Sequence, residues 1–165
     1  MGLTRSQQMA RIRATDTRPE LRLASALRRA GFAALPQHRV EGVRVDLVLR
    51  RPRVAVFVDG CFFHGCPKHY VRPRSNTDFW AAKLRENVVR DCRQTLALEA
   101  GGWIVVRAWE HEVFERVDAV VARVFAAVGG RRRKFDGRRV VRVEPMDADG
   151  VMERRHLASL RSPER

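Results

Sequence analysis

The sequence predicts a single α/β domain in which helices flank a mixed β-sheet. Residues 54–58, VAVFV, are apolar throughout, as expected for a strand that is buried on both faces. Segments 17–31 and 77–100, on either side of that strand, repeat apolar residues at helical spacing. Two further strand-like segments, 43–49 and 103–109, and a last helix complete the order helix, strand, strand, helix, strand, helix, which is characteristic of a sheet covered by helices.

The first helix and the first two strands are predicted from local signals. Thr17 is a favourable N-cap, Pro19 suits the first helical turn, and Gly31 can end the helix. Its apolar face contains Leu23, Leu27 and Ala30. Residues 43–49 alternate between two faces. One face consists of Val43, Val45, Leu47 and Leu49, and the opposite face of Arg44, Asp46 and Val48. The turn RPR at 51–53 makes an antiparallel pair with 54–58 possible.

The second half of the domain contains a long helix, a strand and a last helix. The helix over 77–100 ends at Gly101 and Gly102, the strand WIVVRAW follows at 103–109, and valines at helical spacing predict a helix over 111–128. The apolar stripe of the long helix consists of Trp80, Leu84, Val88, Cys92 and Leu96. Its polar face consists of Lys83, Asn87, Arg90, Asp91 and Gln94.

Composition points to a nucleic-acid partner. The 165 residues include 33 Lys and Arg against 19 Asp and Glu, a formal net charge of +14, which favours binding to a polyanion. A basic arm at 1–16 and a basic tail at 129–165 flank the domain at 17–128. No apolar run approaches the ~20 residues of a membrane span, and the polar N-terminus does not resemble a secretory signal. Three cysteines argue against a disulfide framework and favour a reducing cytoplasm.

Cysteine and histidine residues after the buried strand suggest a metal site. Cys61, Cys66 and His69 lie within nine residues, and His111 follows the third predicted strand, where a sheet neighbour can bring it close. Two thiolates and two imidazoles make a closed tetrahedral zinc site of the structural type. The alternative is that both cysteines are small core residues and both histidines lie on the surface.

Carboxylates near strand ends suggest a second, catalytic metal. Asp46 lies within an apolar strand, and Asp59 closes the next one. Such acids in a basic protein favour magnesium bound at a phosphodiester. His64 is a candidate general base, and Glu20 could orient it or hold a metal-bound water. The alternatives are a solvated strand position for Asp46, a turn acid for Asp59 and a helix-dipole residue for Glu20.

Aromatic and basic residues surround the Cys/His segment. The rings are Phe62, Phe63, Tyr70, Phe79 and Trp80, and the basic residues among them are Lys68, Arg72, Arg74, Lys83 and Arg85. Rings presented on a loop can stack on bases or wedge between base pairs. Core packing is the alternative, mainly for Phe79 and the Phe62–Phe63 pair.

Four segments, MARIRATDTRPELRL, VDLVL, VFVDGCFFHGCPKHY and NTDFWAAKLRENVVRDCRQTLALEAGGWIVVRAWEHEV, resemble the very short patch repair (Vsr) DNA mismatch endonucleases in order and spacing, over roughly residues 6–128. The resemblance implies a restriction-endonuclease-like, PD-(D/E)XK-type fold with a structural zinc. It implies a magnesium-dependent cut of one strand, 5′ to the thymine of a T:G mismatch, in duplexes where 5-methylcytosine has deaminated. We expect a monomer in the bacterial cytoplasm, associated with the nucleoid and with mismatch-repair proteins as partners.

The resemblance also assigns residues. It implies that Asp46 and the main-chain carbonyl of Val58 hold magnesium, that His64 is the catalytic histidine, supported by Glu20, and that Asp91 belongs to the active site. The residues expected to contact DNA are the rings of Phe62, Phe63 and Trp80, together with Lys83, Asn87 and Arg90 on the polar helix face.

This chain departs from the family pattern at several positions. Asp59 stands where the best-known members have histidine and could add a metal ligand, and Phe63 replaces a tryptophan. His69 falls one residue later than the usual zinc ligand, and His111 replaces a cysteine. Cys61 stands at the nearest position to the lysine of related folds, so the proton transfer falls to His64.

Other functions stay open at this point. A zinc-stabilised DNA-binding module without catalysis, or a nuclease with a different target, would share the same composition. The joint presence of Asp46, His64 and Glu20 favours an enzyme, because acids directed at phosphates would weaken a protein that only binds DNA.

Overall fold

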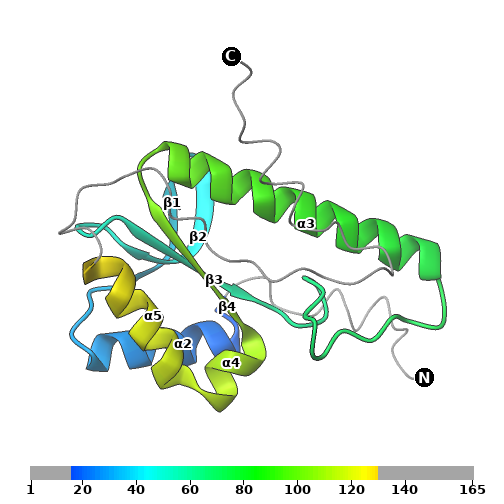
Figure 1. The fold of residues 1–165 in the computed structure, drawn as a ribbon, viewed down its shortest axis with the longest axis horizontal. Helices are drawn as coiled ribbons and strands as arrows, with labels where there is room; N and C mark the ends of the chain where they lie inside the picture. The colour runs from blue at the N-terminus through cyan, green and yellow to red at the C-terminus, as the bar shows by residue number, and fades with distance from the viewer. Residues whose placement is uncertain (1–15, 130–165) are drawn as a thin grey trace.

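The structure is a computed structural model that describes residues 16–129. Nearly all of the predicted arm 1–16 and tail 129–165 lies outside the described residues. The elements are, in order, α2 Arg18–Arg29, β1 Leu35–Val40, β2 Val43–Leu49, β3 Val54–Asp59, α3 Thr77–Ala100, β4 Ile104–Trp109, α4 Glu110–Glu115 and α5 Val117–Gly129 (Figure 1).

The four strands form one mixed sheet in the order β1-β2-β3-β4. β1 pairs with β2, and β2 with β3, in antiparallel orientation. β3 and β4 are parallel, with Phe57 opposite Arg107 and Asp59 opposite Trp109. The long helix α3 connects these two strands, as a parallel pair requires. The predicted mixed sheet flanked by helices is confirmed.

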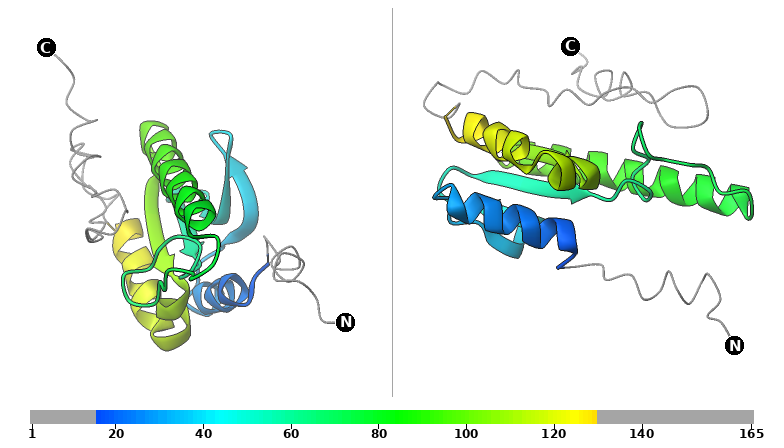
Figure 2. Two further views of the ribbon diagram at one scale, coloured as in Figure 1. Left: turned by 90° about the vertical axis from the view of Figure 1, so that its right-hand side faces the viewer. Right: turned by 90° about the horizontal axis from the view of Figure 1, so that it is seen from below.

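Two apolar cores lie on the two faces of the sheet (Figure 2). On one face, α2, α4 and α5 pack against the sheet with buried residues that include Leu23, Leu27, Leu47, Val56, Val113, Val120 and Val124. On the other face, α3 packs with Leu98 over Val45, Val48, Ala55, Phe57 and Val105. β2 therefore contributes to both cores. Val48, predicted to share a face with Arg44 and Asp46, is fully buried.

The first strand, β1, was not predicted from the sequence. Its residues, LPQHRV, are only partly buried because β1 is an edge strand, so they do not show the alternation of a half-buried strand. The last predicted helix, 111–128, is in fact two helices, α4 and α5, separated at Arg116. At Arg116 the φ angle is −145°, outside the helical range.

Helix α3 extends well past the sheet, and the segment 60–76 runs beneath its projecting half (Figure 1). Within α3, the buried residues are Leu84, Asn87 and Leu98, and the other members of the predicted apolar stripe are half-buried. The segment 60–76, which contains no helix or strand, is the link between the sheet and the first turn of α3. In the described part of the chain no helix is sufficiently long and apolar to span a membrane.

Candidate active site

Asp46 lies at an interruption of the sheet. The β1–β2 register runs through Pro36 opposite Leu47 and His38 opposite Val45, but it omits the pair that Gln37 would make with Asp46. Gln37 has a φ angle of +47°, which is unusual for a non-glycine residue and is often found at functional sites. On the other side of β2, Asp46 Oδ2 accepts a hydrogen bond of 2.8 Å from the Val58 N–H of β3.

The environment of Asp46 suits a carboxylate that gives up a proton when a cation binds. Burial raises the pKa of Asp46 to about 6, and the negative charges of Glu20 and Asp59 act in the same direction. The Val58 hydrogen bond and the charge of Arg107 oppose this increase only in part. A divalent cation would relieve the repulsion among these acids.

Glu20 lies on the Asp46 side of the site. The carboxylate is buried and accepts hydrogen bonds from Thr17 Oγ1 at 2.7 Å, from the Asp16 N–H at 3.1 Å and from Gln37 Nε2 at 2.6 Å. Its hydrogen bonds thus come from the two residues that precede α2 and from β1. The carboxylate hydrogen-bonded to the His64 ring is that of Asp91, so support of His64 by Glu20 stays a prediction.

Asp91, from α3, is the carboxylate that contacts His64. His64 Nδ1 lies 2.5 Å from Asp91 Oδ2 and 3.6 Å from Asp59 Oδ1. Burial alone would raise the pKa of Asp91, but the hydrogen bond from His64 and the charge of Arg107 hold it below its ordinary value. Asp91 is therefore an ionised acceptor that fixes the orientation of the imidazole.

Arg107, on β4, is a site residue that the sequence reasoning missed. Its Nε donates to Asp59 Oδ2 at 2.8 Å and its Nη2 to Asp59 Oδ1 at 2.5 Å, a bidentate pair. The same Nη2 lies 3.4 Å from Asp91 Oδ1. Both Asp59 oxygens are thus engaged by the guanidinium. The available signal was a lone charge in the apolar strand IVVRAW, beside a strand that ends in an acid.

The Cys/His cluster is assembled as predicted. Ligand atoms of Cys61, Cys66, His69 and His111 all lie within 4.8 Å of one another. Cys61 Sγ is 3.3 Å from His111 Nδ1, and Cys66 Sγ is 3.5 Å from His111 Nδ1 and 3.7 Å from His69 Nδ1. Zinc bonds of ~2.3 Å to sulfur and ~2.05 Å to nitrogen at tetrahedral angles require S···N separations of roughly 3.5 Å. The four residues therefore fit one zinc ion.

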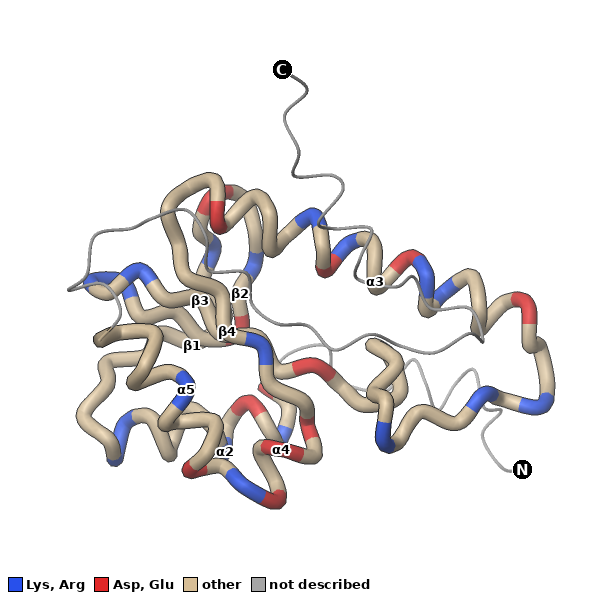
Figure 3. Tube along the Cα trace, viewed as in Figure 1, with Lys and Arg blue, Asp and Glu red and all other residues tan. Residues whose placement is uncertain are grey.

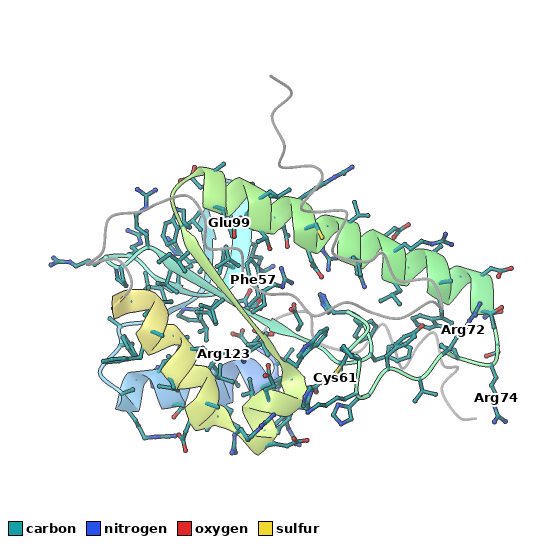
Figure 4. The ribbon with its side chains drawn as sticks, viewed as in Figure 1. Phe57, Cys61, Arg72, Arg74, Glu99 and Arg123 are labelled. Carbon is teal, nitrogen blue, oxygen red and sulfur yellow. The ribbon has the colours of Figure 1, made fainter. Side chains whose placement is uncertain are left out.

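Short turns hold the loop between the cluster and the acids. His64 N–H donates to the Gly60 carbonyl at 3.1 Å and Cys66 N–H to the Cys61 carbonyl at 2.9 Å. Between His64 and Cys66, Gly65 has a φ angle of +68°, a conformation that glycine adopts without the penalty of a side chain. Figure 4 shows Cys61 where β3 passes into this loop, close to the β4–α4 junction.

The aromatic side chains form a contiguous cluster at the first turn of α3. The Phe62 ring lies 5.3 Å from Phe63, 5.2 Å from Trp80 and 6.1 Å from Tyr70, centroid to centroid. Trp80 in turn lies 5.3 Å from Phe79, which is 61% exposed. These rings lie outside both cores of the sheet and pack on one another instead.

Comparison with known proteins assigns the family. The family model described as DNA mismatch endonuclease Vsr matches residues 2–70. The chain is 43% identical over 125 residues to the type II nicking enzyme V.NaeI of Lentzea aerocolonigenes, covering 73% of this chain and 74% of that protein. It is 38% identical over 108 residues to the DNA mismatch endonuclease Vsr of Escherichia coli K12, covering 65% and 69%.

The chain belongs to the Vsr DNA mismatch endonuclease family.

The Vsr assignment makes the protein a DNA endonuclease with a restriction-endonuclease-like sheet, and such nucleases use divalent metal ions. The type II nicking enzyme V.NmeAIP of Neisseria meningitidis, 33% identical, aligns over 75% of this chain and 94% of its own length. Among solved structures, the catalytic domain of the homing endonuclease I-Bth0305I aligns with a TM-score of 0.47 and 21% identity over 68% of this chain and 94% of that chain.

The residues expected to contact DNA in this Vsr protein occupy different environments. Lys83 and Arg90 are exposed on α3. Lys83 Nζ lies 3.1 Å from Glu86 Oε2, and Arg90 Nη2 lies 3.3 Å from Asp91 Oδ1. Asn87 is buried and its Nδ2 donates to the Phe63 carbonyl at 2.8 Å, so it anchors the aromatic loop. Basic positions recur along α3 and the preceding loop (Figure 3), where Arg72 and Arg74 lie at the far end (Figure 4).

Proposed function

We propose that this Vsr-family endonuclease cuts one strand of duplex DNA 5′ to the thymine of a T:G mismatch, with Mg²⁺ as cofactor, and so begins the repair of deaminated 5-methylcytosine. The observation that carries the proposal is the 2.5 Å contact between His64 and Asp91 at the same end of the sheet as the Asp46 carboxylate. A protein that only bound DNA would gain nothing from this convergence of acids, which repel phosphates.

The oxygen-rich site formed by the middle of β2 and the end of β3 suits magnesium. We propose that Asp46 and the main-chain carbonyl of Val58 hold the ion, with Glu20 contributing negative charge next to Asp46. When bound, the ion supplies charge neutralisation for the phosphodiester and its leaving oxygen. The side chain of Val58 takes no part, so an apolar residue is acceptable there.

His64 is proposed as the general base. With Nδ1 held against Asp91, the neutral ring carries its lone pair on Nε2, which is then the atom that accepts a proton from the attacking water. The role of Asp91 is to select this tautomer and to stabilise the imidazolium that results, as a carboxylate does in other histidine-dependent hydrolases. Asp59 Oδ1 lies farther from His64 Nδ1 than Asp91 does, at 3.6 Å.

The zinc ion is proposed to be structural and to be held by Cys61, Cys66, His69 and His111. Such a site would tie the loop to the first turn of α4, since His111 belongs to that helix. The loop carries both His64 and the rings of Phe62 and Phe63. One zinc site would therefore position the proposed general base together with the wedge, the set of rings proposed to insert between base pairs. The Trp80 ring, 5.2 Å from Phe62, completes the wedge from α3.

Selection of the mismatch is proposed to come from unstacking. Insertion of rings between base pairs costs a few kcal/mol per step, and less where the pair is mismatched. Exposed Lys83 and Arg90, with the basic arm and tail, would supply phosphate contacts that do not depend on sequence. The protein is proposed to act as a monomer on bacterial chromosomal DNA, where proteins of mismatch repair are its possible partners.

The test uses labelled duplexes that differ only in T:G against T:A, with and without magnesium, and compares the wild type with Asp46→Ala. We expect magnesium-dependent nicking of the thymine strand of T:G only, and a loss of at least about 100-fold in Asp46→Ala with duplex affinity little changed. A wild-type protein that binds but does not cut, or a variant within a few-fold of wild type, would refute the proposal.

A further inference from the structure

The floor of the active site contains a buried cation that the proposed reaction does not yet use. Arg107 belongs to β4, and its side chain is only 14% exposed. The guanidinium lies 4.6 Å from the centroid of the Phe57 ring, its neighbour on β3. Figure 4 shows Phe57 between the sheet and α3, so the Arg107 side chain extends into that layer, toward the acids from β3 and α3.

The contacts of Arg107 join the two acids that flank His64. Nε and Nη2 hold both oxygens of Asp59, at 2.8 and 2.5 Å, and Nη2 also lies 3.4 Å from Asp91 Oδ1. Nη1 donates to the Asp91 carbonyl and to Thr95 Oγ1, both at 3.4 Å. A single planar group thus links β3, β4 and α3 around the histidine.

The same geometry decides between two uses of the acids. Asp59, His64 and Asp91 present ligand atoms within 4.8 Å of one another and could in principle hold a metal ion. The guanidinium already engages both oxygens of Asp59 and one oxygen of Asp91, and a second cation would have to approach it closely. Positive charge is thus built into this position by the chain itself.

We infer that Arg107 is a positioning residue of the nicking reaction, which clamps Asp59 and Asp91 so that Asp91 holds the His64 ring in its working orientation. The inference rests on the proposed function of His64. It also assigns Asp59 to the clamp rather than to a metal ion, and so gives a role to the aspartate that departs from the family pattern.

A purely structural role is less consistent with the energetics. A buried ion pair often contributes no more stability than well-packed apolar residues of the same size, because the desolvation of both charges offsets their attraction. Removal of one partner alone, however, leaves an uncompensated buried charge and destabilises strongly. The experiment must therefore separate charge compensation from positioning.

The test compares Asp59→Asn with the double variant Asp59→Asn/Arg107→Gln in the 165-residue chain. In Asp59→Asn the guanidinium keeps Asp91 as its counter-charge, and residue 59 is uncharged in both variants, so the comparison isolates the guanidinium. Arg107→Lys keeps the charge but removes the fork, and Arg53→Gln, which breaks an exposed pair with Glu41 at the other end of β3, is the matched control. We measure thermal midpoints, duplex affinity and the single-turnover rate of nicking at T:G.

We expect the double variant to fold, to bind duplex within about threefold of Asp59→Asn, and to nick at least about tenfold more slowly, since misorientation of a general base costs a large part of its contribution. Arg107→Lys should show a smaller loss in rate with unchanged affinity, and Arg53→Gln no loss. Equal rates in Asp59→Asn and the double variant would overturn the inference.

A second readout does not depend on cutting. Nitrogen-15 spectra of the His64 ring, assigned by comparison with His64→Gln, report which nitrogen carries the proton. We expect a single Nδ1–H form in the wild type and a mixture in the double variant. An unchanged ring signal would also overturn the inference. If the wild type does not nick, the proposed function fails, and the ring spectra still show whether Arg107 orients His64.

Discussion

The Asp46 carboxylate accepts a 2.8 Å hydrogen bond from the backbone N–H of Val58, so the two residues proposed to hold magnesium are directly joined. The bond uses Oδ2 and leaves Oδ1 as the oxygen available to an ion. It also fixes a carboxylate in a buried setting that raises its pKa to about 6. The position thus combines a defined ligand geometry with an unfavourable charge.

This unfavourable charge predicts a pH-dependent stability. The Asp46 pKa is about 6 in the folded protein against 3.8 for an ordinary aspartate, so between these values the folded state binds more protons than the unfolded state. The free energy of unfolding therefore falls as pH rises from about 4 to about 6, by roughly 3 kcal/mol at most. Above about pH 6 the free energy of unfolding stays lower by this amount, and below about pH 4 the charge of Asp46 no longer reduces it.

Asp46→Asn should remove this effect. Without added magnesium, we expect the variant to be more stable than wild type by on the order of 2–3 kcal/mol at pH 7.5, and by clearly less at pH 4.5. Urea unfolding at both pH values measures the difference. Asp118→Asn, an exposed acid in the first turn of α5, should change stability by less than about 1 kcal/mol. Equal stability of wild type and Asp46→Asn at pH 7.5 would show that the charge of Asp46 does not destabilise the folded protein.

Removal of a cysteine from the cluster should remove the metal. Cys66 is fully buried and faces two imidazole nitrogens at 3.5 and 3.7 Å, so Cys66→Ser should give metal-free, poorly soluble protein, because structural zinc contributes about 10 kcal/mol or more of binding free energy to folding. Metal analysis should find about one zinc per wild-type chain. Cys92→Ser, on α3 outside the cluster, should retain the metal. Wild-type protein without zinc would contradict this prediction.

The aromatic cluster should determine mismatch preference. In Phe63→Ala/Trp80→Ala we expect nicking at T:G to fall at least about tenfold, because base–aromatic stacking contributes about 1–3 kcal/mol per base. Binding to any duplex should persist and weaken as salt rises. Nicking and affinity are measured on T:G and T:A duplexes at two salt concentrations. Phe125→Ala, an exposed ring on α5, is the control; equal losses for both duplexes in the double variant would show that the rings are general contacts.

Asn87 should affect nicking because it holds in place the loop that carries His64. Asn87→Ala leaves the Phe63 carbonyl without its 2.8 Å donor and should cost about 1–3 kcal/mol of stability. Since His64 follows Phe63 in the loop, nicking should fall by about tenfold while duplex binding changes little. Arg93→Ala, exposed on the same helix, should leave stability within about 0.5 kcal/mol of wild type. If Asn87→Ala nicks at the wild-type rate, the hydrogen bond from Asn87 to the Phe63 carbonyl is not needed for catalysis.

The sequence predicted the elements that have a clear period and a clear end. Helix α2 begins after Thr17 and ends before Gly31, whose φ angle is +85°, and the antiparallel β2–β3 pair follows the RPR turn. Strand β1 escaped prediction because an edge strand with a partly exposed pattern has no period to detect. The break at Arg116 escaped because Val113, Val117 and Val120 keep helical spacing across it.

The candidate site was predictable where chemistry is local in sequence. Cys61, Cys66 and His69 revealed themselves by spacing, and only the position of His111 depended on strand order. The partner of His64 could not be derived from spacing, because Asp91 follows it by 27 residues and meets it only through the packing of α3. Arg107 is harder still, since a lone arginine in a strand most often lies on a solvated face, and its pairing with Asp59 appears only when β3 and β4 lie side by side.

The Cys/His cluster has an unequal spacing along the chain. His69 follows Cys66 by three residues, but His111 follows Cys61 by 50, so the fourth ligand is delivered by β4 and α4. A loop of that length costs more entropy to close than a short one, and β4 must pair with β3 before His111 arrives. If zinc binds these four residues as proposed, a nascent chain that has not yet reached β4 would offer only three ligands and would exchange the ion readily. We therefore expect full retention of the ion to coincide with completion of the sheet, as a late step in the maturation of the nascent protein.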